Sequence, residues 1–210
     1  MEKRDRIIAY IDGSNFYHLC KSNYGLANIS FEKVIKTLLK TNEEIIKIKY
    51  FNSPINQQEE PEKYIGQQKF FNKIKNEALI ELHLGRLVKR PLNKITLNCE
   101  KCGIVEIENL ECPKCSRKTP VEKVHKTSEK GPDVKMAIEI LLDALNNKYD
   151  SAFILSGDAD FCPAIKHIIN VLNKRVILCR FPKPKTNELI QSCSETRIIT
   201  KDFILNSKLA

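Results

Sequence analysis

Short apolar runs recur along the chain, and longer segments with apolar residues at helical spacing separate them. The apolar runs have the length and β-branched content of buried strands, and they span residues 6–11, 45–51, 79–88, 152–155 and 175–179. Helices are expected at about 14–24, 31–40, 59–76, 131–147, 161–172 and 186–193, with a short last strand at 197–199. Strands that alternate with helices predict an α/β sandwich with a mainly parallel sheet.

Capping residues indicate where several of these helices begin and end. Ser14 or Asn15 is expected to cap the first helix, and Gly25 to end it. Ser30 is placed to cap the second helix, and Pro132 stands at the start of a later one. The residues after 199 are expected to form a tail.

The alternation of strands and helices is interrupted between about residues 91 and 126. This stretch is short of large apolar residues and holds four of the eight cysteines. We therefore expect a discontinuous main domain, formed by residues 1–90 and 127–210, with a small inserted unit at 91–126. A chain of 210 residues is long enough for one domain with such an insertion.

Two Cys-x-x-Cys pairs lie in the insertion. Cys99 and Cys102 form the first pair, and Cys112 and Cys115 form the second. Four thiolates bind Zn²⁺ tetrahedrally and leave no open coordination position, as in structural zinc sites. We expect a zinc ribbon whose metal replaces a hydrophobic core, with a hairpin near 104–107 between the pairs. A redox role would need a thioredoxin-like context, which the sequence lacks.

The role of the insertion beyond structure is left open. It could contact nucleic acid through its basic residues, mediate dimerisation or act as a rigid lid. The basic residues are Lys94, Lys101, Lys114, Arg117 and Lys118, and they are interspersed with Glu100, Glu106, Glu108 and Glu111. The other cysteines, Cys20, Cys162, Cys179 and Cys193, fall on predicted core elements and are interpreted as small buried hydrophobes.

The charge balance favours a polyanionic partner. The chain has 35 Lys and Arg against 26 Asp and Glu, a formal net charge of +9, which suits RNA or DNA. Arg86, Lys89, Arg90 and Lys130 are candidates for phosphate contacts, although each alone is equally well explained as solvated surface. No run of 18 apolar residues and no signal peptide are present, so we expect a cytoplasmic, reducing location and no membrane partner.

Four aspartates fall at positions that a doubly wound sheet brings to one edge. Asp12 ends the first strand, and Asp158 follows the fourth after a Ser-Gly turn. The common strand order 3-2-1-4-5 makes these strands neighbours, and ligands bind at their carboxyl ends. Asp133 and Asp160 stand at helix starts on the same edge, and Asn15 joins them from the first helix.

Carboxylates gathered in one cleft repel each other unless a cation lies among them. Oxygen ligands suit Mg²⁺ or Mn²⁺, and a site of this kind beside a basic surface meets the needs of metal-assisted phosphodiester hydrolysis. Each aspartate alone is also explained as a helix cap or a turn residue. The metal-site hypothesis therefore depends on all four carboxylates meeting.

Three segments resemble the signature segments of NYN domains, in the LabA-like branch of the PIN-like nuclease superfamily. They are residues 8–15 (IAYIDGSN), 130–134 (KGPDV) and 155–163 (LSGDADFCP), and the resemblance covers about 1–90 and 128–205. It implies a Rossmann-like three-layer α/β/α fold and a Mg²⁺-dependent ribonuclease site whose products carry a 5′-phosphate. By this resemblance the metal is held by four aspartates, and water or substrate is positioned by an asparagine: Asp12, Asp133, Asp158, Asp160 and Asn15.

Two further acids are candidates for the same site. Glu139 lies on the helix that Asp133 opens, but its angular offset of about 240° points it elsewhere. Domains of this kind often carry another aspartate after the last helix, where this chain has Glu195. Either Glu195 substitutes for it or that element is absent.

These features predict a metal-dependent endoribonuclease that carries a structural zinc ribbon. RNA is the expected partner, single-stranded DNA is also allowed, and a homodimer is left open. One alternative is a nucleic-acid-binding regulator that keeps the fold and cleaves poorly. Another is a phosphohydrolase of the haloacid dehalogenase type, since an Asp-x-Asp follows a strand here, although that family places the pair after its first strand.

Overall fold

The computed structural model describes residues 4–25, 29–91, 95–121, 124–182 and 187–207, and the chain divides into two compact units. The first unit comprises residues 1–85 and 131–210, and the second comprises residues 86–130. The insertion expected at 91–126 lies inside the second unit. No helix among the described residues is both long enough and apolar enough to cross a lipid bilayer.

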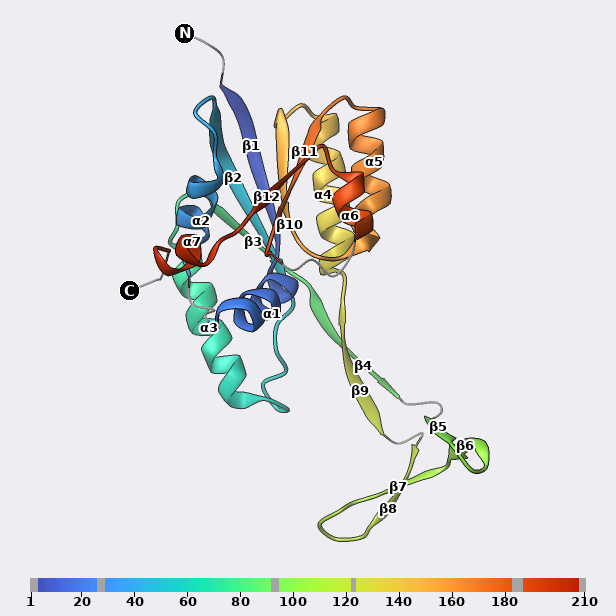
Figure 1. Cartoon of the computed structure of the whole chain (residues 1–210). Helices are drawn as coiled ribbons and strands as arrows, with labels where there is room; N and C mark the ends of the chain where they lie inside the picture. The colour runs from blue at the N-terminus through green and yellow to red at the C-terminus, as the bar shows by residue number, and fades with distance from the viewer. Residues whose placement is uncertain (1–3, 26–28, 92–94, 122–123, 183–186, 208–210) are drawn as a thin grey trace. The chain divides into compact units, whose positions relative to one another are not determined.

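A six-stranded parallel sheet forms the centre of the first unit (Figure 1). Its strands are β1 (Asp5–Asp12), β2 (Glu43–Asn52), β3 (Ile80–Leu84), β10 (Ser151–Leu155), β11 (Arg175–Arg180) and β12 (Glu195–Ile198). They pair in the order β12-β11-β10-β1-β2-β3, and every pair is parallel. The predicted order 3-2-1-4-5 is confirmed, and β12 extends it by one strand.

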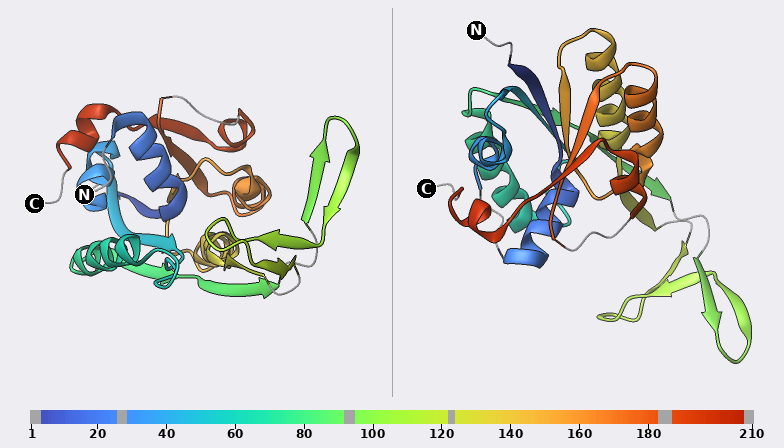
Figure 2. Two further views of the ribbon diagram at one scale, coloured as in Figure 1. Left: turned by 90° about the horizontal axis from the view of Figure 1, so that it is seen from below. Right: turned by 45° about the horizontal axis from the view of Figure 1, so that its top comes forward.

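Helices cover both faces of this sheet and bury apolar side chains against it. One face carries α1 (Gly13–Tyr24), α2 (Phe31–Leu38), α3 (Pro61–Lys75) and α7 (Lys201–Leu205). The other face carries α4 (Pro132–Leu145), α5 (Cys162–Asn170) and α6 (Asn187–Ser192), of which α4 and α5 lie side by side (Figure 2). Central strand β1 alternates between the two cores, with Ile7 in the first and Ile8 in the second, which explains its unbroken apolar run. The predicted α/β/α sandwich is confirmed.

Two helix boundaries differ from the predicted ones. Asp12 caps α1, because its carboxylate accepts a hydrogen bond from the backbone N–H of Asn15, at 3.0 Å. The last residue of the strand therefore takes the role expected of Ser14 or Asn15. At the other end of the chain, the expected tail contains α7, which Thr200 caps through the backbone N–H of Phe203. The caps at Gly25 and Ser30 are confirmed.

The strand expected at 79–88 is two strands in different units. β3 ends at Leu84, and β4 (Arg86–Pro91) begins the second unit after Gly85. The alternation of Ile80, Leu82 and Leu84 stops at Gly85, since Arg86 follows and the next apolar residues, 87 and 88, are adjacent. This change of phase and a glycine inside a strand pattern were the available signals.

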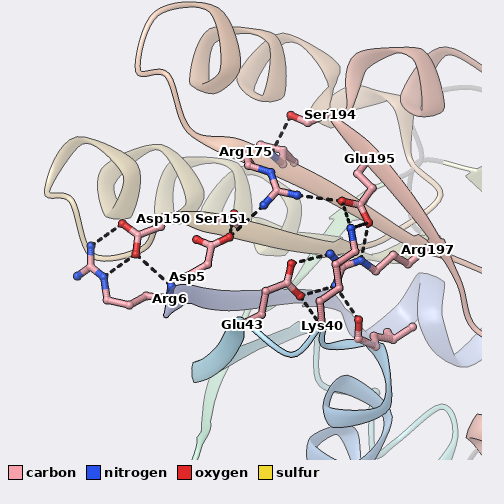
Figure 3. A network of polar contacts seen from close by, with 12 residues as sticks. Asp5, Arg6, Lys40, Glu43, Asp150, Ser151, Arg175, Ser194, Glu195 and Arg197 are labelled. Carbon is pink, nitrogen blue, oxygen red and sulfur yellow. Dashed lines mark hydrogen bonds and ion pairs between the residues drawn. The ribbon is translucent and has the colours of Figure 1, made fainter. Parts of the chain in front are cut away.

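Charged side chains tie together the starts of the parallel strands, at the edge opposite to the carboxyl ends (Figure 3). We call this group the amino-edge network: Asp5, Arg6, Lys40, Glu43, Asp150, Ser151, Arg175, Ser194, Glu195 and Arg197. Arg197 from β12 makes two contacts with Glu43 of β2, at 2.6 and 2.7 Å. Arg175 of β11 bridges Asp5 and Glu195, at 3.1 and 2.9 Å.

A second buried charge cluster joins α4 to the sheet. Lys49 of β2 lies 2.6 Å from Asp143 and 2.6 Å from Glu139, both on α4. The hydroxyl of Tyr10 donates to Asp143 at 2.7 Å. Removing charges from water is costly unless they are paired, so this set of contacts holds α4 in one orientation on the sheet.

The second unit is built from antiparallel strand pairs. β4 pairs with β9 (His125–Lys130), β5 (Ile95–Cys99) with β6 (Gly103–Ile107), and β7 (Asn109–Glu111) with β8 (Lys118–Pro120). Residues 104–107 pair back with the strand that precedes the first Cys-x-x-Cys pair. The prediction of a hairpin between the two cysteine pairs is therefore wrong, and each pair lies instead in the turn of its own hairpin.

Candidate active site

The site is built first from the carboxyl ends of β1 and β10, which are neighbours with Ile11 opposite Leu155. The next residues, Asp12 and Ser156, are in direct contact, because the Ser156 hydroxyl donates to Asp12 Oδ2 at 2.9 Å. The other oxygen, Oδ1, accepts from the N–H of Asn15. Asp12 is only 8% exposed, so these contacts hold its carboxylate in one position.

A chain of hydrogen bonds continues through the turn after β10. The N–H of Asp158 donates to the Ser156 hydroxyl at 3.1 Å, and Asp158 Oδ1 accepts from the N–H of Asp160 at 3.0 Å. The side-chain oxygen of Asn15 accepts from the N–H of Gly157 at 3.0 Å. Asn15 therefore ties the start of α1 to the turn after β10.

Four aspartates from three parts of the chain form an acidic cluster at this edge. Its members are Asp12, Asp133, Asp158 and Asp160. Partial loss of solvent raises the pKa of the Asp133 carboxyl, and the negative charges of the other three members raise it further. Asp133 lies in the first turn of α4, so the structure brings the start of that helix to the ends of β1 and β10.

Close packing behind Asp12 leaves no room for a side chain at the next position. A Cβ on Gly13 would lie 2.3 Å from the Tyr50 hydroxyl oxygen and 2.8 Å from the carbonyl oxygen of Phe51. Tyr50 is buried, and burial together with the nearby charge of Asp12 raises the pKa of its hydroxyl. The glycine after Asp12 is therefore required by packing.

The acidic cluster fits a hard divalent cation in the type and charge of its ligands. All of its ligand atoms are oxygens. The charges of the other three carboxylates raise the free energy needed to ionise Asp133, and a bound cation would lower it. Within the described ranges, however, no group of three or more His, Cys, Asp or Glu side chains is arranged to hold a metal ion. The carboxylates share one edge of the sheet without enclosing a common point.

The two additional acids considered from the sequence do not join the cluster. Glu139 forms an ion pair with Lys49 and so points away from the cluster, which is the orientation that its angular position on α4 predicted. Glu195 belongs to the amino-edge network, where Arg197 and Lys40 lower the pKa of its carboxyl to about 2. It lies at the start of β12, so it does not substitute for an aspartate at the carboxyl ends.

The two cysteine pairs have the same local geometry. The sulfur of Cys99 accepts hydrogen bonds from the backbone of Lys101 and Cys102, and these bonds lower the pKa of its thiol. Cys112 accepts corresponding bonds from Lys114 and Cys115, with the same effect on its pKa. The described residues do not bring the two pairs together into a metal site, and the expected zinc ribbon is not confirmed.

The remaining cysteines are at least half-buried, whereas the described basic residues considered for phosphate contact lie on the surface. Cys20, Cys162 and Cys179 are buried, and Cys193 is half-buried. The candidates for phosphate contact, Arg86, Lys89, Arg90 and Lys130, are exposed on β4 and β9 of the second unit. Lys101, Lys114, Arg117 and Lys118 are exposed in the same unit, and Lys94 lies outside the described residues.

Two features of this edge were not identified from the sequence. Ser156 joins Asp12 to the Asp158 turn, and its position directly after an apolar strand was the available signal. His83 of β3 stacks on Phe51, with ring centroids 4.6 Å apart, and both lie in register with Asp12 across the sheet. Burial lowers the pKa of His83, so its neutral form is favoured.

Comparison with known proteins agrees with this architecture. The sequence profile of the NYN domain family matches residues 6–200. A solved structure of a protein of unknown function from Vibrio parahaemolyticus superposes with a TM-score of 0.59, at 18% identity, over 97% of this chain and 98% of that one. At that level of identity the likeness concerns the fold.

A curated relative comes from Pseudomonas putida, where it is named 6-hydroxy-3-succinoylpyridine 3-monooxygenase HspA. It is 29% identical over 174 residues, which covers 76% of this chain and 54% of that protein. The chain thus spans about half the length of this relative.

Proposed function

The chain belongs to the NYN domain family, part of the PIN-like nuclease superfamily, and from this premise we propose that it is a metal-dependent endoribonuclease. It would hydrolyse RNA phosphodiester bonds at the acidic cluster, with Mg²⁺ or Mn²⁺ as cofactor. The observation that carries the proposal is the chain of hydrogen bonds that links Asp12 at the end of β1, through Ser156, to Asp158 in the turn after β10. Burial is the largest cause of the raised pKa of Asp133 on α4, and the charges of Asp12, Asp158 and Asp160 add to it, so these carboxylates lie within electrostatic reach of each other.

The chain's own residues have distinct parts in this proposal. Asp12 is fixed by Ser156 and by the start of α1, so it is the rigid ligand. Asp133 and Asp160 are exposed and can adjust to the cation. A divalent cation bound there would neutralise charge on the scissile phosphate and lower the pKa of the attacking water.

Asn15 acts as a positioning residue, because its side-chain oxygen is engaged by the N–H of Gly157. The amide nitrogen of the same side chain is the group left to orient water or a substrate phosphate. We expect a 5′-phosphate on the product, as the family resemblance implies. Substrates are RNA first and single-stranded DNA second.

The test is cleavage by the purified full chain. Labelled RNA and single-stranded DNA are incubated with Mg²⁺ or Mn²⁺, beside an Asp158→Asn variant and an Asp202→Asn control. Asp202 is exposed on α7, so the control changes the charge equally outside the acidic cluster. RNA cleavage by the wild type and the control, but not by Asp158→Asn, supports the proposal.

Other outcomes select other functions. RNA that is bound but cleaved by none of the three proteins identifies a nucleic-acid-binding regulator. Release of phosphate from small monoesters, with RNA intact, identifies a phosphohydrolase of the haloacid dehalogenase type.

The relative's name raises a further candidate, hydroxylation of a pyridine ring. This chain spans only 54% of that protein. Turnover of 6-hydroxy-3-succinoylpyridine by this chain, with no RNA cleavage, would replace the nuclease proposal.

For the second unit, we propose a structural zinc ion held by Cys99, Cys102, Cys112 and Cys115. The backbone hydrogen bonds that lower the pKa values of Cys99 and Cys112 favour the thiolate form that zinc requires. The two pairs would have to close around one ion. Metal analysis of the native chain should give about one zinc per chain, and Cys99→Ser should lose it. A zinc content that Cys99→Ser leaves unchanged would contradict the proposal.

A further inference from the structure

Strands β4 and β9 form a two-stranded antiparallel ribbon with a continuous register. Arg86 stands opposite Lys130, Val88 opposite Ser128, and Pro91 ends the pairing opposite His125. The Ser128 hydroxyl donates to the carbonyl of Val88, which adds a side-chain contact to the ladder. β4 begins the second unit and β9 ends it, so the two strands of the ribbon flank the rest of that unit in the sequence.

One face of the ribbon gathers positive charge. Side chains alternate between the two faces of a strand, so Arg86, Val88 and Arg90 share one face and Lys89 lies on the other. Lys130 stands opposite Arg86 and therefore shares the face of the two arginines. Arg86 and Arg90 lie four residues apart, or about 13 Å along the strand. All three cations are exposed.

This arrangement is unfavourable for the ribbon alone. Like charges directly opposite each other on an antiparallel pair destabilise it. Among the described residues, none of the three forms an ion pair or a side-chain hydrogen bond that would offset the repulsion. In the amino-edge network, by contrast, each arginine contacts a carboxylate. The cations of the ribbon are thus arranged for an anionic ligand from outside the chain.

The composition of the second unit restricts what that ligand is. Residues 86–130 contain no Phe, Tyr or Trp, whereas the rest of the chain holds all 9 Phe and 6 Tyr. Proteins that bind single strands stack bases on aromatic side chains. A ribbon that has cations without aromatics can contact phosphates but has no such platform for unstacked bases. Double-stranded RNA shields its bases and is recognised through its shape and backbone, so it matches this surface.

We propose that the β4–β9 ribbon binds the phosphate backbone of double-stranded RNA through Arg86, Arg90 and Lys130, without reading sequence. The inference rests on the proposed function, because it specifies the class of RNA that the nuclease takes. It also separates Lys89, on the opposite face, from the binding set.

Binding is measured on the full chain carrying Asp158→Asn, so that cleavage does not interfere. The probes are a labelled hairpin RNA and a single-stranded oligouridine of the same length, titrated at several salt concentrations. In this background, Arg86→Gln/Arg90→Gln/Lys130→Gln should lower the slope of log K against log salt by about 2–3, at about 0.9 per phosphate contact. At physiological salt this corresponds to about 100-fold weaker hairpin binding.

Two variants serve as controls. Lys89→Gln removes one positive charge from the other face. It should change the slope by less than about 0.9, the value for one phosphate contact. Arg86→Lys/Arg90→Lys keeps the charge and should keep the slope. If the triple variant does not fold, each single Gln substitution should still lower the slope by about 1.

The inference is overturned if the triple variant binds the hairpin with an unchanged slope, if Lys89→Gln weakens binding as much, or if oligouridine binds more tightly than the hairpin. The nuclease proposal fails on a different result, namely the absence of RNA cleavage by the wild type. The two failures are therefore distinguishable.

Discussion

Replacing Arg197 with methionine tests whether the amino-edge network stabilises the fold. The guanidinium makes two contacts with Glu43, at 2.6 and 2.7 Å, and one with Glu195, at 2.8 Å. It also donates to the carbonyl of Leu38 at 2.6 Å and lies 4.9 Å from the ring centroid of Phe153. The side chain of Arg197 is 9% exposed and that of Glu43 is 1% exposed. If one of them is removed, water therefore cannot solvate the charge of the other.

The expected cost follows from this burial. Removing one partner of a buried ion pair costs about 3–5 kcal/mol, because the other charge stays buried and unpaired. For a chain of this size, 1 kcal/mol corresponds to about 2–4 °C in Tm, so Arg197→Met should melt about 6–20 °C lower. Adding Glu43→Gln removes the stranded charge and should restore about 1–3 kcal/mol.

Urea unfolding followed by circular dichroism gives these differences. The matched control is Lys47→Met, since Lys47 lies 3.9 Å from Glu81 and both are about half exposed. A surface pair of this kind contributes at most about 1 kcal/mol. A loss below about 1 kcal/mol for Arg197→Met, or a double variant no more stable than the single one, would refute the reasoning.

The pH dependence gives an independent check with a definite sign. Burial opposes ionisation of Glu43, but the hydrogen bonds from Arg197 and from the backbone of Lys40, together with the positive charges of both residues, outweigh it and lower the pKa of Glu43 below its usual 4.5. The stability contributed by this pair is therefore present above pH 4.5 and is lost as the pH falls through the lowered value. The gap in unfolding free energy between wild type and Arg197→Met should be largest at neutral pH and should narrow in acid.

Two further predictions concern the carboxyl edge of the sheet. Gly13→Ala should lower the unfolding free energy by about 1–3 kcal/mol, because the added Cβ would overlap the Tyr50 hydroxyl, and thermal melting measures the change. A Tm equal to that of the wild type would show that Tyr50 can move aside. Ser156→Ala removes the hydroxyl shared by Asp12 and Asp158, so cleavage should need a higher Mg²⁺ concentration for half-maximal rate, read from a metal titration. An unchanged half-maximal concentration would mean that Asp12 is positioned without Ser156.

A doubly wound sheet was predictable because the apolar runs are short and buried on both faces, and the common strand order of such sheets is the one observed. β1 alternates between two hydrophobic cores, and such a strand has to lie inside a sheet covered by helices on both sides. The edge on which the acids lie followed from the same pattern, since parallel strands all present their carboxyl ends together. Asp12 and Asp158 could be paired before the structure was known for this reason.

The break at Gly85 and the place of Glu195 could not be read in the same way. The apolar alternation changes phase after Gly85, where Arg86 follows Leu84, but a change of phase does not record that the chain leaves one sheet and pairs with another strand. Glu195 is close in sequence to the last helix, but the direction of β12 places it at the amino edge, where Arg197 and Lys40 meet it. Arg197 is two residues from Glu195, but Lys40 is 155 positions away, and only folding brings it to this edge.

The sequence by itself determined the α/β sandwich, because local periodicity is carried by the residues of each strand and helix. The strand order, and with it the edge on which four aspartates gather, was predicted from the common order of doubly wound sheets. Tertiary structure alone decided how the acids are held: Asp12 by Ser156, α4 by a buried lysine, and Asp133 within the field of the other carboxylates. Hydrogen bonds and charge effects of this kind depend on distances between residues far apart in the sequence, up to the 144 positions between Asp12 and Ser156, and only the packed chain sets those distances.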